Sequence, residues 1–148
     1  MRTAYRVLAL AIAALVVIQA AVIGYGMFAQ LNWIDHGGTL DKSALESSAP
    51  GAAAFLLHGL NGGIALLLSL ALLIISFFAK IAQGVRWAVI VLIATVVQVA
   101  LGMLSHTLTA VGALHWAVAL VLFGVAVGAA THARKLAPVK ERVPTDVA

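Results

Sequence analysis

The chain has 148 residues, of which 64% are hydrophobic and only 9% are charged. Soluble domains are about 45–50% apolar and about 25% charged, so this composition excludes an ordinary globular enzyme, a disordered chain and a coiled coil. Cysteine is absent, which excludes disulfides, thiolate-bound metals, iron–sulfur clusters and haem attached through a Cys-x-x-Cys-His motif. We therefore expect a protein of the lipid bilayer.

Long ranges without charge predict four membrane-spanning helices. No Asp, Glu, Lys or Arg occurs in residues 7–34, 47–79 or 87–133. A spanning helix needs about 20 apolar residues, so the first two ranges predict one helix each. The third range is long enough for two, and the polar segment 105–112 divides it. The predicted fold is an all-α membrane protein, a bundle of four transmembrane helices at about 7–29, 52–79, 87–106 and 113–133.

The basic residues predict the orientation of this bundle. Of the nine Lys and Arg residues, eight lie on the side of the two termini, and Lys42 alone lies in the loop 31–51. Positive charge concentrates in cytoplasmic segments, so we expect a multi-pass protein of a bacterial plasma membrane with both termini inside and this loop outside. The helical domain is expected to cover 1–137, before a short cytoplasmic tail at 138–148. Cations at membrane boundaries do not indicate a nucleic-acid partner.

Two predicted hairpins carry matching polar residues. The first and third helices each have a glutamine near the middle, Gln19 or Gln98, and the second and fourth each have a histidine towards the outer end, His58 or His115. The match is consistent with a duplicated hairpin, and chance similarity between apolar helices is the alternative. Either way, the two histidines share one depth on alternating helices and can face each other across the core. The glutamines are expected to hydrogen-bond across helices, with a ligand or quinone contact as the alternative.

Ionisable groups within a membrane are costly and are functional candidates by default. Two imidazoles on facing helices are suited to holding the iron of a haem from opposite sides, inside apolar walls that the bundle supplies. The sequence therefore predicts one haem b (protohaem IX), with His58 and His115 as its metal ligands near the outer face. Gly59 and Gly62 would let the backbone approach the ring, and Trp116 would lie at its edge; close helix packing is the alternative use of the glycines. No catalytic residue is predicted.

The polar edge of such a haem needs donors at the outer surface. His36, His106 and Lys42 are the expected partners of its carboxylates. The alternative for His36 and His106, and for His132 at the inner end, is an ordinary interfacial histidine bonded to a carbonyl or water. A copper or zinc site formed by His36, His106 and His115 is a further alternative, although their spacing is not a known metal pattern.

The chain resembles one four-helix half of haem A synthase, across residues 6–134. The resemblance is carried by His58, His115 and the segment QVALGMLSHTLTAVGALHWAVAL at 98–120. In that family each half holds a haem between histidines at the outer ends of its second and fourth helices, which implies that role for His58 and His115. The family's Glu-x-x-His-Arg element and its cysteine pair are missing, so the resemblance implies a haem kept as a cofactor. The chain also looks like small actinobacterial four-helix membrane proteins.

Together these features predict a small b-type cytochrome-like protein for electron transfer or haem handling. Its expected partners are haem, the lipid bilayer, and quinol or a periplasmic redox protein, and it could form a homodimer or join a larger membrane complex. A cofactor-free accessory or assembly subunit is the first alternative. A haem-modifying enzyme related to haem A synthase is the second.

Overall fold

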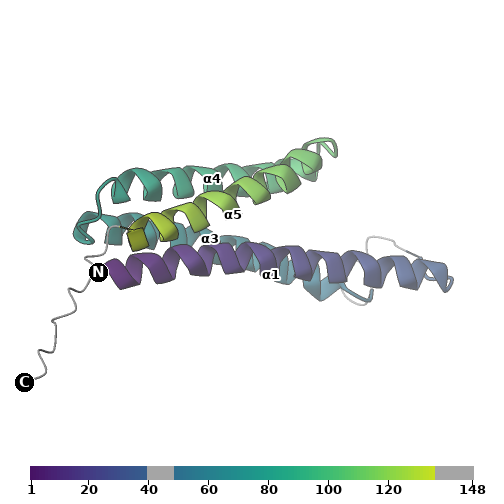
Figure 1. Ribbon diagram of the computed structural model, residues 1–148. Helices are drawn as coiled ribbons and strands as arrows, with labels where there is room; N and C mark the ends of the chain where they lie inside the picture. Colours follow the sequence, from purple (N-terminus) through teal and green to yellow (C-terminus); the bar gives the residue numbers. More distant parts are fainter. Residues whose placement is uncertain (40–48, 136–148) are drawn as a thin grey trace, which may run out of the picture.

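The computed structural model describes residues 1–39 and 49–135 (Figure 1). These residues form the four helices α1 (Arg2–Asp35), α3 (Ala52–Phe78), α4 (Gly84–Ser105) and α5 (Val111–Lys135). Each helix is long and apolar enough to cross a membrane. The predicted fold class, an all-α protein with four transmembrane helices, is confirmed.

The four helices are arranged in a ring. Helix α1 packs against α3 and α5, and α4 packs against the same two helices; within the described ranges, the diagonal pairs α1–α4 and α3–α5 have no Cα atoms within 8 Å of each other. Successive helices run in opposite directions, so the start of α1, the α3–α4 turn and the end of α5 meet at one end of the bundle (Figure 1). We call this the inner end, and the opposite end the outer end.

Helix α1 is longer than predicted at both ends. It covers Arg2–Asp35, whereas the sequence predicted 7–29, with the start placed directly after the charged Arg6. Long charged side chains at the end of a spanning helix can reach the headgroup region, so they do not interrupt the backbone. The predicted loop 31–51 therefore begins later, after Asp35. Lys42 and the predicted tail 138–148 lie outside the described residues.

The half of the bundle at the inner end is tightly packed. Small side chains let the helices approach closely there, because packing rather than exclusion of water drives association in lipid. The core contains seven alanines from α1, α4 and α5 beside a few larger side chains, among them Tyr5, Ile12, Leu72 and Val91, which are fully buried.

Side chains from α1 and α5 hold the α3–α4 turn at the inner end. The guanidinium of Arg2 donates to the carbonyl of Lys80 at 3.0 Å, and the Tyr5 hydroxyl donates to the carbonyl of Gly84 at 3.0 Å. The ring of His132 donates to the carbonyl of Ala82 at 2.8 Å. Of the three carbonyls, that of Gly84 belongs to a buried residue and would be costly to leave unpaired, and all three hydrogen bonds tie the ends of α1 and α5 to the turn.

At the outer end, the backbones of α1 and α3 approach each other closely. A Cβ added at Gly51, which has a φ of +84°, would lie 2.6 Å from the carbonyl oxygen of Gly26. Glycine is therefore required both for this backbone conformation and for the approach of the two helices. Across the bundle, between the α1–α3 and α4–α5 hairpins, no comparable buried cluster forms in the described outer half.

Candidate functional site

A cavity of about 730 Å³ lies between the two hairpins in the outer half of the bundle. All four helices line it, and the buried residues Ala65, Thr95 and Leu122 belong to its wall nearest the packed inner half. Its size falls within the range of about 300–1,000 Å³ that is typical of small-molecule and cofactor pockets. The cavity exists because glycine and other small residues occupy wall positions where larger side chains would fill the space.

The two histidines predicted to face each other do so in this cavity. Helices α3 and α5, which are diagonal in the ring, bring the imidazoles of His58 and His115 to a centre-to-centre distance of 6.0 Å, with an angle of 66° between the ring planes. Both side chains are partly buried and both line the cavity. The prediction from matched depth and alternating helices is confirmed.

The imidazole of His58 is oriented by the neighbouring hairpin helix. Its Nδ1 lies 3.3 Å from the backbone carbonyl oxygen of Gln19, and the Gln19 side-chain amide donates to the carbonyl of His58 at 2.9 Å. A carbonyl only accepts, so the Nδ1 of His58 carries the proton and its Nε2 keeps a free lone pair. Metal-binding histidines commonly have this second bond, which fixes both the tautomer and the ring orientation.

The second hairpin repeats the arrangement. The Nδ1 of His115 lies 2.9 Å from the backbone carbonyl oxygen of Gln98, so this ring has the same tautomer. The side chain of Gln98 behaves differently from that of Gln19, because its amide nitrogen lies 3.3 Å from the Nε2 of His115. In both hairpins, therefore, the backbone carbonyl of the glutamine accepts a hydrogen bond from the Nδ1 of the histidine.

The glutamines were predicted to hydrogen-bond across helices, and this is confirmed for both. The sequence did not indicate that the partner would be the histidine of the same hairpin, although the repeated Gln–His pair was a signal that could have suggested it. The Oε1 atoms of Gln19 and Gln98 are both buried without a hydrogen-bond partner among the described residues. Buried polar atoms are rarely left unpaired, so these two oxygens are matched exceptions at equivalent positions of the two hairpins.

Glycines form an open wall on α3 rather than a packing surface. A Cβ added at Gly59 or Gly63 would meet no described atom within 4 Å, and one at Gly62 would meet only the Gln19 amide nitrogen, at 3.8 Å. The spacing of Gly59 and Gly63 therefore does not serve close helix packing here. All three glycines line the cavity, where they leave room beside His58.

Gly102 is a site residue that sequence reasoning missed. A Cβ at this position of α4 would lie 3.0 Å from Cε1 and 3.2 Å from Nδ1 of His115. The absence of a side chain therefore lets the imidazole lie flat against α4 and reach the carbonyl of Gln98. A glycine four residues after Gln98 was the available signal, because residues four apart share one helix face.

Of the residues predicted to lie around the edge of the haem, some line the cavity and others do not. His106 and Trp116 line the cavity, and both are exposed at the outer end. His36 is not a cavity residue; its exposed ring instead donates from Nδ1 to the carbonyl of Asn32 at 2.7 Å, at the end of α1. His132 lies at the inner end on the Ala82 carbonyl, with its ring centre 5.9 Å from that of Trp87. Lys42 lies outside the described residues.

The copper or zinc site suggested for three histidines does not form in the described part of the chain. There, no three His, Cys, Asp or Glu side chains come together in a group that could hold a metal ion. His58 and His115 form a pair, so a metal bound between them would have to bring its other ligands with it.

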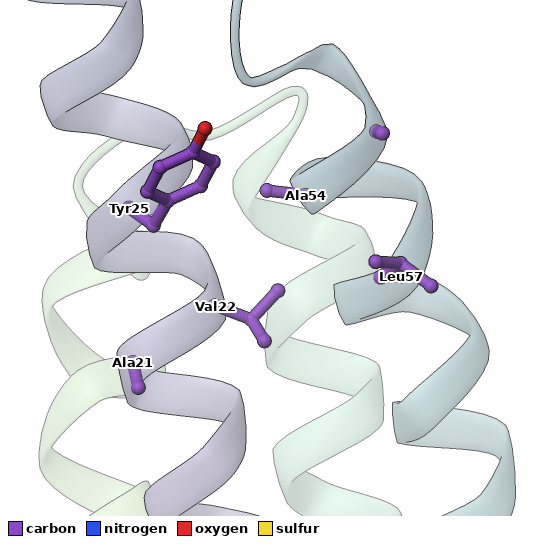
Figure 2. Close-up of a pocket in the computed structure, with 6 residues that line it drawn as sticks. Ala21, Val22, Tyr25, Ala54 and Leu57 are labelled. Atoms are coloured by element: carbon purple, nitrogen blue, oxygen red, sulfur yellow. The ribbon is translucent and has the colours of Figure 1, made fainter.

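A second, smaller hollow of about 330 Å³ lies between α1 and α3. Figure 2 shows Ala21, Val22 and Tyr25 of α1 beside Ala54 and Leu57 of α3. Apart from the Tyr25 hydroxyl, the side chains that line it are apolar, so it offers no set of metal ligands or acid–base groups. Of the two hollows, only the cavity between the hairpins carries groups that can bind a metal.

Any functional assignment therefore has to rest on the facing imidazoles, their glutamine partners and the glycine wall. Comparison of the chain with protein-family models, with curated proteins and with solved structures finds no match.

Proposed function

We propose that this chain is a small b-type cytochrome-like membrane protein, which binds one haem b between His58 and His115. The observation that carries the proposal is the pair of facing imidazoles, each with its Nδ1 proton directed to a glutamine carbonyl. In each ring the Nδ1 is thereby committed to a carbonyl, so the Nε2 is the nitrogen that would bind a metal.

The separation of the two rings agrees with a shared metal ion. A metal–imidazole bond is about 2 Å long, so two imidazoles bound to opposite sides of one ion lie on the order of 6 Å apart between ring centres. The observed distance is 6.0 Å. The ligand set favours iron porphyrin over a bare ion, because among the described residues no third His, Cys, Asp or Glu joins these two histidines in a metal-binding group, and a porphyrin supplies the four remaining ligands.

The walls also suit a flat apolar ring. Gly59, Gly62 and Gly63 leave the α3 side open, and Trp116 and His106 lie at the outer end of the cavity. We assign His106 as a donor to the haem carboxylates at this end, since it is the ionisable residue of the cavity that is exposed there. When bound, the haem supplies one-electron oxidation and reduction.

The distribution of charge supports the predicted orientation and the partners. All six Lys and Arg residues within the described ranges lie at or near the inner end, at positions 2, 6, 80, 86, 134 and 135. This pattern supports the proposal that both termini lie in the cytoplasm of a bacterial cell and that the haem lies near the extracytoplasmic face. His132, the one histidine near the inner end, is bonded to the Ala82 carbonyl. Quinol or a periplasmic redox protein at the outer face is therefore the proposed electron partner.

The resemblance to one half of haem A synthase is consistent with this proposal. The histidines that carry the resemblance are the two that face each other in the cavity. Because the Glu-x-x-His-Arg element of that family is missing from the sequence, we propose that the haem is a cofactor here and not a substrate.

The test is the identity and amount of haem in the purified protein. The full chain should be expressed with ample haem supply, purified in mild detergent, and its pigment extracted for mass spectrometry. We expect one unmodified protohaem per chain. A haem-free protein would favour the accessory-subunit alternative, and a chemically altered porphyrin would favour a haem-modifying enzyme; either result would contradict the proposal.

A further inference from the structure

The two candidate haem ligands, His58 and His115, share one tautomer but differ in the hydrogen bonding of their Nε2 atoms. The Nε2 of His115 is engaged by the side-chain amide of Gln98 at 3.3 Å, whereas the amide of the matching Gln19 is bonded to the backbone carbonyl of His58 at 2.9 Å. Among the described residues, the Nε2 of His58 has no hydrogen-bond partner. The Nε2 lone pair of His58 is therefore free, whereas that of His115 accepts a hydrogen bond.

The tautomer of His115 determines which atom of the Gln98 side chain faces its Nε2. The Nδ1 of His115 must donate to the Gln98 carbonyl, so its Nε2 can only accept, and the group facing it must be the amide NH₂. This leaves the Oε1 of Gln98 buried without a partner. Gln98 thus holds His115 through two atoms, its backbone oxygen and its side-chain nitrogen.

We propose that Gln98 competes with haem iron for the Nε2 of His115, which makes His115 the exchangeable axial ligand and His58 the fixed one. The inference rests on the proposed haem site and deepens it. His115 can give up its bond to iron because the Gln98 amide is in place to take back the same lone pair. His58 has no such competitor, since the Gln19 amide is already committed to a backbone carbonyl.

An exchangeable ligand gives the haem a second binding property. If His115 released the iron, a bound haem would be able to accept a small neutral diatomic ligand of the carbon monoxide class in its place. The exchange is balanced: one nitrogen–iron bond breaks, one ligand–iron bond forms, and one amide N–H bond to Nε2 returns, with no transfer of electrons or protons. A fixed pair of histidines would exclude such ligands.

The test compares Gln98→Leu with the matched control Gln19→Leu. Both substitutions replace the side chain with an apolar one of similar length and keep the backbone carbonyl that holds Nδ1. A single hydrogen bond of this kind changes an equilibrium constant by about 2- to 10-fold. Gln98→Leu should therefore raise the affinity for haem, and lower the apparent affinity of the reduced protein for carbon monoxide, by about that factor.

The control Gln19→Leu shows whether any change in Gln98→Leu comes from loss of the hydrogen bond to His115. Gln19→Leu removes no competitor, so it should not raise haem affinity or weaken carbon monoxide binding. Equal changes in both variants, no change in Gln98→Leu, or a reduced wild-type protein that binds no carbon monoxide would overturn the proposal.

A measurement on haem-free protein tests the Gln98–His115 contact separately from haem binding. In ¹⁵N spectra of the histidine side chains, Gln98→Leu should shift the Nε2 signal of His115, and Gln19→Leu should leave it unchanged. If this shift is seen but the wild-type protein never retains haem, the Gln98 contact is real and the proposed function fails, and the ligand-exchange proposal fails with it. If haem is retained and the shift is absent, only the competition is wrong.

Discussion

Replacement of His58 or His115 by alanine is expected to lower the haem bound per chain by more than about tenfold. Loss of an outer partner of a metal ligand already costs 10- to 100-fold in metal affinity, and loss of the ligand itself should cost at least as much. His58→Ala should be the more severe, because His58 is the ligand without a competing hydrogen bond. The measurement is the haem-to-protein ratio after purification in mild detergent.

His132→Ala is the control for this result. Its ring bonds the Ala82 carbonyl at the inner end of the bundle, and His132 does not line the cavity. The substitution removes a contact worth about 1 kcal/mol to the α3–α4 turn but should leave the haem content unchanged. Equal retention in all three variants would show that the ligands lie elsewhere, and equal loss would indicate a general effect on folding.

Gly102→Val should also reduce haem binding, although neither His58 nor His115 is replaced. The added Cβ would lie 3.0 Å from Cε1 and 3.2 Å from Nδ1 of His115, and the two methyl groups of valine would add to the collision. The imidazole would then be displaced from the Gln98 carbonyl that orients it. We expect a loss of haem of about tenfold, which is the lower range seen when the orientation of a metal ligand is disturbed.

Gly124→Val is the matched control for the Gly102 substitution. Gly124 is also a helical glycine, but a Cβ there would meet no described atom within 4 Å, and it does not line the cavity. Absorbance at the haem band relative to protein should fall for Gly102→Val and remain at the wild-type level for Gly124→Val. A parallel fall in both would mean that β-branched residues in these helices, and not the His115 contact, cause the loss.

The fold could be predicted because lipid restricts what a chain can do. Backbone groups must be satisfied within each spanning segment, so charge-free ranges of sufficient length become helices with few alternatives. The prediction erred at the start of α1, where Arg6 was used as a boundary although the helix begins at Arg2, and at its end, which lies at Asp35 and not at 29. Charged side chains at the edge of a bilayer mark the membrane boundary and not the end of the helix.

The histidine pair could be predicted because polar residues are conspicuous in so apolar a chain. Matched depth on helices α3 and α5 was enough to place His58 opposite His115. Their hydrogen bonds could not be predicted, because these depend on how α1 and α4 are rotated and on side-chain torsions that periodicity does not report. Gly102 escaped notice for the same reason, since its role is to give space to a ring on another helix.

His36 illustrates the weakest part of the sequence reasoning. It was grouped with His106 because both lie near the outer surface in the sequence, and the alternative, an ordinary interfacial histidine bonded to a carbonyl, is the one that the structure bears out. In the structure His106 lines the cavity, while His36 bonds the Asn32 carbonyl at the end of α1. A residue beyond the end of a helix has no periodic pattern to fix its direction, so nearness to the same surface does not establish a shared site.

The central claim, one haem held by two histidines, is tested most directly by the absorption spectrum of the purified full-length protein in its oxidised and reduced states. We predict a sharp Soret band and, on reduction, the split visible bands of a six-coordinate low-spin haem b. A spectrum without haem bands after expression with ample haem supply would contradict the account.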